Sequence, residues 1–225
     1  MNPEEHILQS WRTNAAPWAK AIRTQSIESR KLVTNKAIVD VILELRPQTM
    51  LDVGCGEGWL CRTMAAHKIS AWGIDAIPEL INSANEQGHA NFSVCSYQEI
   101  VQGKFKSTQL FDVIVFNFSL FGNELVESML LQLRTNFSAK GKLIIQTLHP
   151  HSASADQPYA DGWRTGSWNG FSEEFTDPAP WYFRTLESWV ELLSRTNYKL
   201  HQLREPVHPH TQRPASLILV GDPIH

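Results

Sequence analysis

The chain has 225 residues, of which 42% are hydrophobic and 19% are charged, and its formal net charge is −3. This balance excludes a disordered chain and disfavours a broad nucleic-acid surface, and the length suits one domain. The first residues, MNPEEHILQSWRTN, lack the pattern of a signal peptide, and no apolar run is long enough to span a membrane. Three cysteines without a CxxC pair fit a reducing compartment. We therefore expect a cytoplasmic protein that binds neither nucleic acid nor membrane.

The N-terminal segment, residues 1–46, is expected to be helical. Residues 1–25 are polar with scattered tryptophans and predict short helical pieces. Ser26 or Ser29 can cap a longer helix that runs to about Leu45 and ends before Pro47. Its apolar face would hold Leu32, Val33, Val39, Ile42 and Leu43.

Residues 47–149 alternate between strand and helix patterns. The spacing predicts helices over 59–67, 78–88 and 123–137, and strands over 49–53, 70–75, 91–95, 111–118 and 141–148. Such alternation is typical of βαβ units, which build a parallel sheet with helices on both faces. The near-continuous apolar runs FDVIVFNF and KLIIQTL fit strands that are buried on both sides.

The pattern changes after residue 149. Residues 150–184 hold Pro, Gly and Ser beside eight aromatic residues. We interpret this segment as a lid inserted after the fifth strand, with a small apolar core under a long loop as the alternative. Thr185 can cap a further helix, and residues 198–205 and 214–221 predict two strands at the C-terminus.

The most informative motif is LDVGCGEGWL at residues 51–60. It places D-x-G-x-G-x-G between a strand and a helix, where glycines let a ligand approach the helix N-terminus. The next strand ends at Asp75, a position from which a carboxylate can bind both ribose hydroxyls. The pair predicts a nucleoside-containing cofactor. A dinucleotide site would prefer a small residue where this chain has Trp59.

With these motifs the chain resembles the class I S-adenosylmethionine-dependent methyltransferases, motif by motif over residues 49–149 and in outline elsewhere. The resemblance implies a doubly wound α/β fold with seven strands, mostly parallel. The last strand would be antiparallel and lie between the fifth and sixth, as the C-terminal hairpin allows. It also implies S-adenosylmethionine as cofactor and S-adenosylhomocysteine as product.

The resemblance further implies a set of cofactor-binding positions. Gly56 and Gly58 would shape the loop, Asp75 would hold the ribose, and Ile74 would border the adenine, with Cys55 a small filler in the loop. Ser96 stands where the family usually has an aspartate. The segment FNFSLFG lacks the D/N-P-P-Y/F motif of many enzymes that methylate DNA or protein nitrogens. The complete set is Asp52, Gly54, Cys55, Gly56, Gly58, Asp75, Ala76, Ile77, Ser96, Tyr97, Asn117 and Leu120.

The tripeptide His-Pro-His occurs at 149–151 and again at 208–210. Both copies follow strands and should lie at the carboxyl edge of the sheet, where ligands bind in such folds. A shared metal site is disfavoured because residues on either side of an extended proline point apart, and we expect no metal. His149 is predicted as a general base or substrate ligand. For His208 and His210 a structural role is favoured.

We predict methyl transfer to a small molecule, within a single methyltransferase domain of residues 1–225. It comprises the N-terminal segment, a cofactor-binding core (47–149), the insert (150–184) and a C-terminal helix with a β-hairpin (185–225). A nicotinamide-dependent oxidoreductase and a noncatalytic S-adenosylmethionine-binding protein remain as alternatives, and neither the oligomeric state nor the methyl acceptor follows from the sequence. The candidate substrate residues are Trp18, Arg30, His151, Trp163, Trp168 and Trp181.

Overall fold

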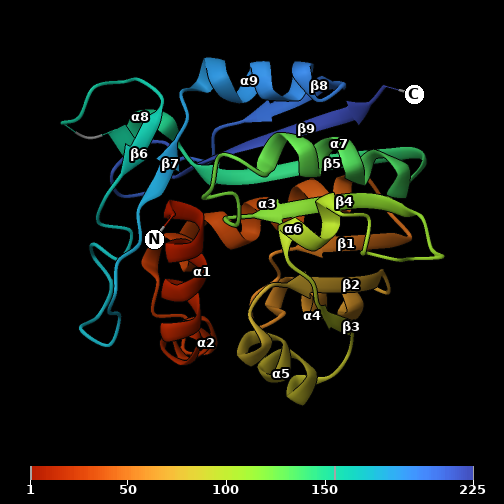
Figure 1. Cartoon of the computed structure of the whole chain (residues 1–225), viewed down its shortest axis with the longest axis horizontal. Coiled ribbons are helices and arrows are strands. Elements are labelled where there is room, and N and C mark those ends of the chain that lie inside the picture. The colour runs from red at the N-terminus through yellow and green to blue at the C-terminus, as the bar shows by residue number, and fades with distance from the viewer. Residues whose placement is uncertain (1, 155, 225) are drawn as a thin grey trace.

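A computed structural model describes residues 2–154 and 156–224 and consists of a central sheet with helices on both faces (Figure 1). The helices are α1 (Pro3–Thr13), α2 (Ala15–Arg23), the π-helical turn η1 (Arg30–Thr34), α3 (Asn35–Glu44), α4 (Trp59–Ala66), α5 (Pro78–Gln87), α6 (Tyr97–Val101), α7 (Val126–Leu133), the 3₁₀ turn η2 (Arg134–Asn136), α8 (Pro150–Ser154) and α9 (Leu186–Arg195). The strands are β1 (Thr49–Val53), β2 (Ser70–Asp75), β3 (Asn91–Val94), β4 (Phe111–Asn117), β5 (Phe137–Leu148), β6 (Gly162–Arg164), β7 (Trp181–Phe183), β8 (Tyr198–Arg204) and β9 (Ser216–Pro223).

The main sheet has seven strands in the order β3-β2-β1-β4-β5-β9-β8. The first five are parallel, and β9 pairs antiparallel with both β5 and β8. The predicted fold is therefore confirmed, including the last strand between the fifth and the sixth. The order reverses between β1 and β4, which is where ligands bind in doubly wound folds.

Each face of the sheet carries its own apolar core. On β4, Phe111 and Phe116 pack with residues of α6, α7 and α9, while Val113 and Val115 pack with residues of α3 and α4 on the other face. This alternation explains the continuous apolar run in the sequence, because both faces of the strand are covered.

Several predicted elements differ in detail from the structure. The helix predicted over 123–137 is shorter, since η2 follows α7 and β5 begins at Phe137. The helix expected over 26–45 contains the π-helical turn η1, in which Arg30 is buried, before α3 begins at Asn35. Such turns insert one extra residue into the helix, and sequence periodicity does not reveal them. The insert also holds regular structure that we did not predict: α8 and the antiparallel pair β6–β7.

Helices α1 and α2 lie beyond the carboxyl ends of the parallel strands, close to the insert (Figure 1). Leu8, Trp11 and Trp18 pack there against Ile77 and Leu80, which follow β2. The N-terminal segment therefore covers the edge at which the glycine loop lies. Within the described part of the chain, no helix has both the length and the apolar character needed to cross a membrane.

Candidate active site

A cavity of about 350 Å³ opens at the carboxyl ends of β1, β2 and β4, beneath α1. The glycine loop forms its floor, and Leu8, Trp11 and Trp18 from the N-terminal helices line the opposite wall. The predicted cofactor residues that line it are Asp52, Gly54, Cys55, Gly56, Asp75, Ala76, Ile77, Ser96, Tyr97 and Asn117.

The glycine loop needs glycine for two different reasons. A Cβ on Gly54 would lie 2.4 Å from the Cβ of Ser119, so the loop can approach the end of β4 only without a side chain. Gly58 has φ +82° at the N-cap of α4, and a Cβ there would strike the ring of Phe92 at 2.5 Å. Gly58 does not line the cavity. Its predicted place among the cofactor contacts is thus corrected to a packing position.

Asp75 is buried and held by the loop backbone. One carboxylate oxygen accepts a hydrogen bond from the backbone N–H of Gly56 at 2.9 Å, and the other accepts one from Ile77 at 2.9 Å. Burial raises its pKa to about 6, although these backbone hydrogen bonds favour the charged form. The carboxylate is oriented before any ligand binds, with its remaining lone pairs free to accept hydroxyl donors.

Asp52 is a second buried carboxylate on the cavity floor. Burial and the neighbouring charge of Asp75 raise its pKa to about 7, while a hydrogen bond from the Cys61 thiol and the charge of Arg30 act in the opposite direction. Its Oδ1 has no hydrogen-bond partner within the described residues. A cationic or hydrogen-bond-donating ligand group would satisfy this atom.

Arg30 brings a positive charge to the same cavity. Its guanidinium lies 5.5 Å from the ring centroid of Trp18 and 5.0 Å from that of Trp59, and the residue is only 7% exposed. Burial lowers its pKa to about 10, against the opposing charges of Glu57 and Asp52. Nε and Nη2 are buried without a partner among the described residues, so an anionic ligand group would complete the site.

Ser96 and Tyr97 contribute in different ways. The Ser96 hydroxyl accepts from the backbone N–H of Glu99, and the Glu99 carboxylate accepts from the backbone N–H of Ser96, which makes a capping box that starts α6. The hydroxyl also donates to this carboxylate. Tyr97 donates to the carbonyl of Ser119 at 3.0 Å and ties the end of β3 to the end of β4. Burial raises the pKa of its hydroxyl, which stays protonated.

The segment after β4 shows why one prediction is wrong. Asn117 lines the cavity as expected, but Phe118 has φ +53° and turns the chain. Ser119 and Phe121 line the cavity, whereas Leu120 is 4% exposed and packs in the core. Leu120 is therefore not a cavity residue, because its side chain lies on the core side of this segment.

The two His-Pro-His copies do not meet in the cavity. His149 is buried, and its Nε2 pairs with the carboxylate of Glu205 at 2.8 Å, which links the ends of β5 and β8. His208 Nδ1 accepts from the backbone N–H groups of His210 and Thr211 and shapes a turn. His149 does not line the cavity, and its ring faces Glu205; its role as a base or substrate ligand stays a prediction. No group of three or more metal-binding side chains occurs in the part of the chain that is described.

The predicted substrate residues are scattered. Trp18 and Arg30 line the cavity. Trp168 stands behind its wall, 4.9 Å from Trp11 between ring centroids. His151 is exposed on α8, and Trp163 is exposed and packs edge-on against Tyr182 in the β6–β7 hairpin.

Trp181 lines a separate small hollow under β7, where Arg184 is also buried. Neither His151, Trp163 nor Trp181 lines the cavity.

The cavity residues that the sequence analysis missed include Leu8, Trp11, Trp59, Phe121 and Glu4. Three of these lie on α1 at positions 4, 8 and 11, one face of a helix. That spacing was visible in the sequence. It could have indicated a helix that presents one face to a binding site.

Comparisons with known proteins agree with this geometry. The sequence profile of a family described as a methyltransferase domain matches residues 27–203. Two curated relatives named ubiquinone biosynthesis O-methyltransferase share 25% identity over 64% of the chain (Rickettsia canadensis) and 24% over 71% (Rickettsia felis). The chain spans 62% and 64% of their lengths.

Solved structures share the fold at low identity. A Burkholderia thailandensis 1,6-didemethyltoxoflavin-N1-methyltransferase, solved with its substrate and S-adenosylhomocysteine, matches with TM-score 0.70 and 15% identity over 100% of this chain and 92% of that one. A putative S-adenosylmethionine-dependent methyltransferase from Listeria monocytogenes gives 0.63 and 17% over 81% and 97%. The chain belongs to the methyltransferase domain family, and it shares the fold of class I enzymes that use S-adenosylmethionine.

The polar groups and the glycine loop that line the cavity suit S-adenosylmethionine. The cavity offers an unpartnered cation at Arg30, an unpartnered carboxylate oxygen at Asp52 and a glycine cradle that a Cβ would fill at Gly54. The methionine moiety of the cofactor carries a carboxylate that suits Arg30 and an ammonium group that suits Asp52. The ribose supplies hydroxyl donors for Asp75. The residues present therefore suit an adenosyl amino acid.

Proposed function

We propose that the cavity binds S-adenosylmethionine and that the chain transfers its methyl group to a small-molecule acceptor. One observation supports the proposal most directly. Arg30 and Asp52 bring opposite charges to the same cavity, and both have buried polar atoms without a hydrogen-bond partner among the described residues. The oriented carboxylate of Asp75 lines the same cavity. A peptide or nucleic-acid substrate is less consistent with it, because α1 and the insert cover the carboxyl edge of the sheet.

In this proposal each polar residue has one task. Arg30 binds the carboxylate of the methionine moiety and Asp52 its ammonium group. Asp75 accepts hydrogen bonds from the ribose hydroxyls. Ile77 and Leu80 pack against the adenine from the α5 side.

When bound, the cofactor supplies a sulfonium whose methyl group is already activated for in-line displacement. The protein then has to orient the acceptor and exclude water, since near-attack geometry lowers the barrier without a covalent intermediate. Asn117 and Phe118 lie at the end of β4, beside the floor that would hold the methionine moiety. They are the residues expected to border the reacting atoms.

The names of the similar proteins support a small acceptor and leave its atom open. One group is named for an O-methyltransferase and the solved neighbour for an N1-methyltransferase. We expect the protein in the cytoplasm, in keeping with thiols that remain unpaired at Cys55, Cys61 and Cys95. We treat residues 1–225 as one functional domain.

Calorimetric titration tests the proposal. S-adenosylmethionine and S-adenosylhomocysteine should bind the wild type, and NADH should not. Asp75→Asn should weaken both adenosyl ligands at least tenfold, because an amide cannot keep two backbone N–H groups satisfied and still accept from the ribose. Asp112→Asn is the matched control. Asp112 also accepts two backbone N–H bonds, from Gln48 and Thr49 at the opposite edge of the sheet.

Two outcomes would contradict the proposal. Binding of NADH alone would require a dinucleotide site instead. Equal affinities for wild type and Asp75→Asn would move the ligand away from this cavity. If the adenosyl ligands bind as expected, incubation with methyl-labelled cofactor and a panel of phenols and heteroaromatic amines identifies the acceptor.

A further inference from the structure

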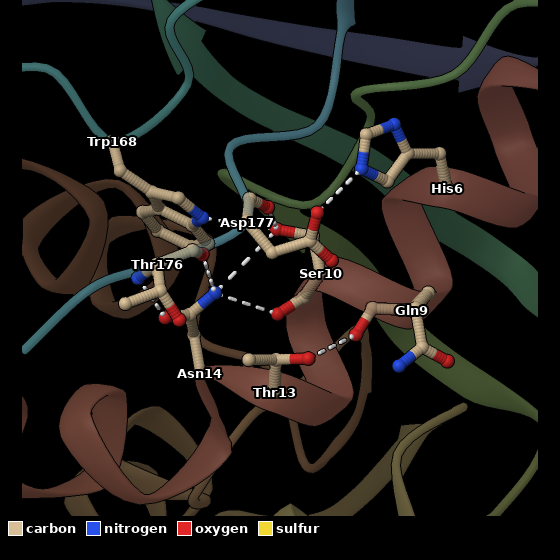
Figure 2. A network of polar contacts seen from close by, with 8 residues as sticks. All are labelled: His6, Gln9, Ser10, Thr13, Asn14, Trp168, Thr176 and Asp177. Carbon is tan, nitrogen blue, oxygen red and sulfur yellow. Dashed lines mark hydrogen bonds and ion pairs between the residues drawn. The ribbon is translucent and has the colours of Figure 1, made fainter.

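Helix α1 makes contacts on two of its faces. Glu4, Leu8 and Trp11 line the cavity. His6, Ser10 and Asn14 form a second stripe, spaced four residues apart, and this stripe contacts the insert (Figure 2). Residues at i and i+4 lie on the same side of a helix, so this side of α1 faces the insert.

Asn14 is the centre of this contact. It is fully buried, and its amide makes a reciprocal pair with the backbone of Thr176: Nδ2 donates to the carbonyl at 2.7 Å, and Oδ1 accepts from the N–H at 2.9 Å. Nδ2 also donates to the carbonyl of Ser10 at 2.8 Å. Every polar atom of the side chain is therefore used. A buried network that is fully satisfied specifies one arrangement of its parts.

Ser10 and Trp168 add further contacts between α1 and the insert. Ser10 is 1% exposed; its hydroxyl donates to the carbonyl of Asp177 and accepts from the indole N–H of Trp168 at 2.9 Å. The Trp168 ring in turn packs edge-on against Trp11, which lines the cavity. The partly exposed pair of His6 and Asp177, at 2.8 Å, adds little by itself.

In contrast, α1 is held to the strand side of the cavity mainly by apolar contacts with Ile77 and Leu80 and by Glu4. The carboxylate of Glu4 accepts from the backbone N–H groups of Asn123 and Glu124 at 2.7 and 2.6 Å. The hydrogen bonds between α1 and the insert are thus the more deeply buried ones. The contacts that hold α1 to the strand side of the cavity would lie beside a bound ligand.

We propose that Asn14 is a positioning residue that joins α1 to residues 166–177 of the insert, so that the two open and close over the cavity as one unit, which we call the roof. Asn14 touches no ligand. It sets how often the roof opens, and hence how fast the cofactor enters and its product leaves. The proposal rests on the proposed function only in taking S-adenosylhomocysteine as the cavity ligand.

The first test measures exchange of that ligand. Trp11, Trp18 and Trp59 line the cavity, so stopped-flow tryptophan fluorescence can report binding. Asn14→Asp keeps the size of the side chain and the acceptor for Thr176, but it turns a donor into an anionic oxygen facing two carbonyls. We expect association and dissociation rate constants of S-adenosylhomocysteine both to rise about tenfold, because each requires an open roof.

The control is Thr13→Ala. Thr13 is the last residue of α1, directly before the C-cap Asn14, and its hydroxyl donates to the carbonyl of Gln9 (Figure 2). Both rate constants should stay within twofold of wild type. Trp168→Phe, which removes the donor to Ser10 but keeps an aromatic ring, is the second variant and should act in the same direction as Asn14→Asp.

The second test needs no ligand. Hydrogen exchange followed by mass spectrometry should show faster exchange in Asn14→Asp at both α1 and residues 166–177, to a similar degree. Faster exchange in only one of the two segments would overturn the joined roof. So would unchanged ligand kinetics, or a faster dissociation with unaltered association, which indicates local damage to the cavity. Failure of the wild type to bind the ligand would contradict the proposed function, and the exchange test would still decide this inference.

Discussion

At the residue scale, the two buried carboxylates of the cavity make ligand binding depend on pH. The pKa of Asp52 is about 7 and that of Asp75 about 6 in the ligand-free protein. Below these values both are protonated and accept cationic or hydroxyl donors poorly. We expect S-adenosylhomocysteine to bind at least about tenfold more weakly at pH 5.5 than at pH 8, measured by calorimetry. A flat profile would show that the two carboxylates are not engaged.

The same carboxylates lower the stability of the ligand-free protein. Because their pKa values lie above the ordinary value of 3.8, the folded state holds protons that the unfolded chain has released. The free energy of unfolding therefore falls as the pH rises from about 4 to about 7.

Asp52→Asn should remove the larger part of this effect. At pH 8 we expect it to raise the free energy of unfolding by on the order of 2 kcal/mol, because the desolvated carboxylate charge at this position is then absent, while weakening the adenosyl ligands. Urea unfolding at pH 5, 6.5 and 8 gives the measurement. Lower stability at pH 8 would mean that the charge of Arg30 depends on Asp52 for compensation.

At the element scale, α6 depends on its first residue. Ser96→Ala removes both hydrogen bonds of the Ser96 hydroxyl, with the backbone N–H and with the carboxylate of Glu99, and leaves the bond from the Ser96 backbone N–H to that carboxylate. We expect a loss of about 1 kcal/mol in denaturant unfolding with less than a twofold change in the affinity for S-adenosylhomocysteine. A loss of affinity above fivefold would restore the predicted role of Ser96 beside the adenine.

Some elements could be predicted from the sequence because their signals are local. The strands β4 and β5 are apolar runs flanked by turns, and the glycine loop carries its own conformational requirement. The position of β9 followed from the family resemblance together with the C-terminal hairpin.

Other features depend on contacts that no local pattern contains. Leu120 follows the end of β4, and only the fold shows that it packs in the core while Phe121 lines the cavity. The burial of His149 depends on Glu205, 56 residues away in sequence. The stripe of His6, Ser10 and Asn14 reads as a solvent-facing side of a helix, and only the fold shows that it binds the insert.

At the scale of the whole molecule, ligand binding and folding are coupled, because the cavity walls come from three distant parts of the chain. At one hundred times its dissociation constant, S-adenosylhomocysteine should stabilise the protein by about 2.7 kcal/mol. This corresponds to a rise in Tm of about 5–10 °C for a chain of this size. Differential scanning fluorimetry checks it. An equal rise with NADH, or in Asp75→Asn, would show that the stabilisation does not come from the proposed site.

The two faces of α1, one lining the cavity and one contacting the insert, also limit which substitutions this helix can accept. In an ordinary surface helix about half of the positions tolerate almost any polar residue. Here only positions such as Gln9, Arg12 and Thr13 are exposed and outside both faces. In a library of all single substitutions selected for methyl transfer, α1 should therefore show the mutational profile of a core helix, even though its composition is that of a surface one.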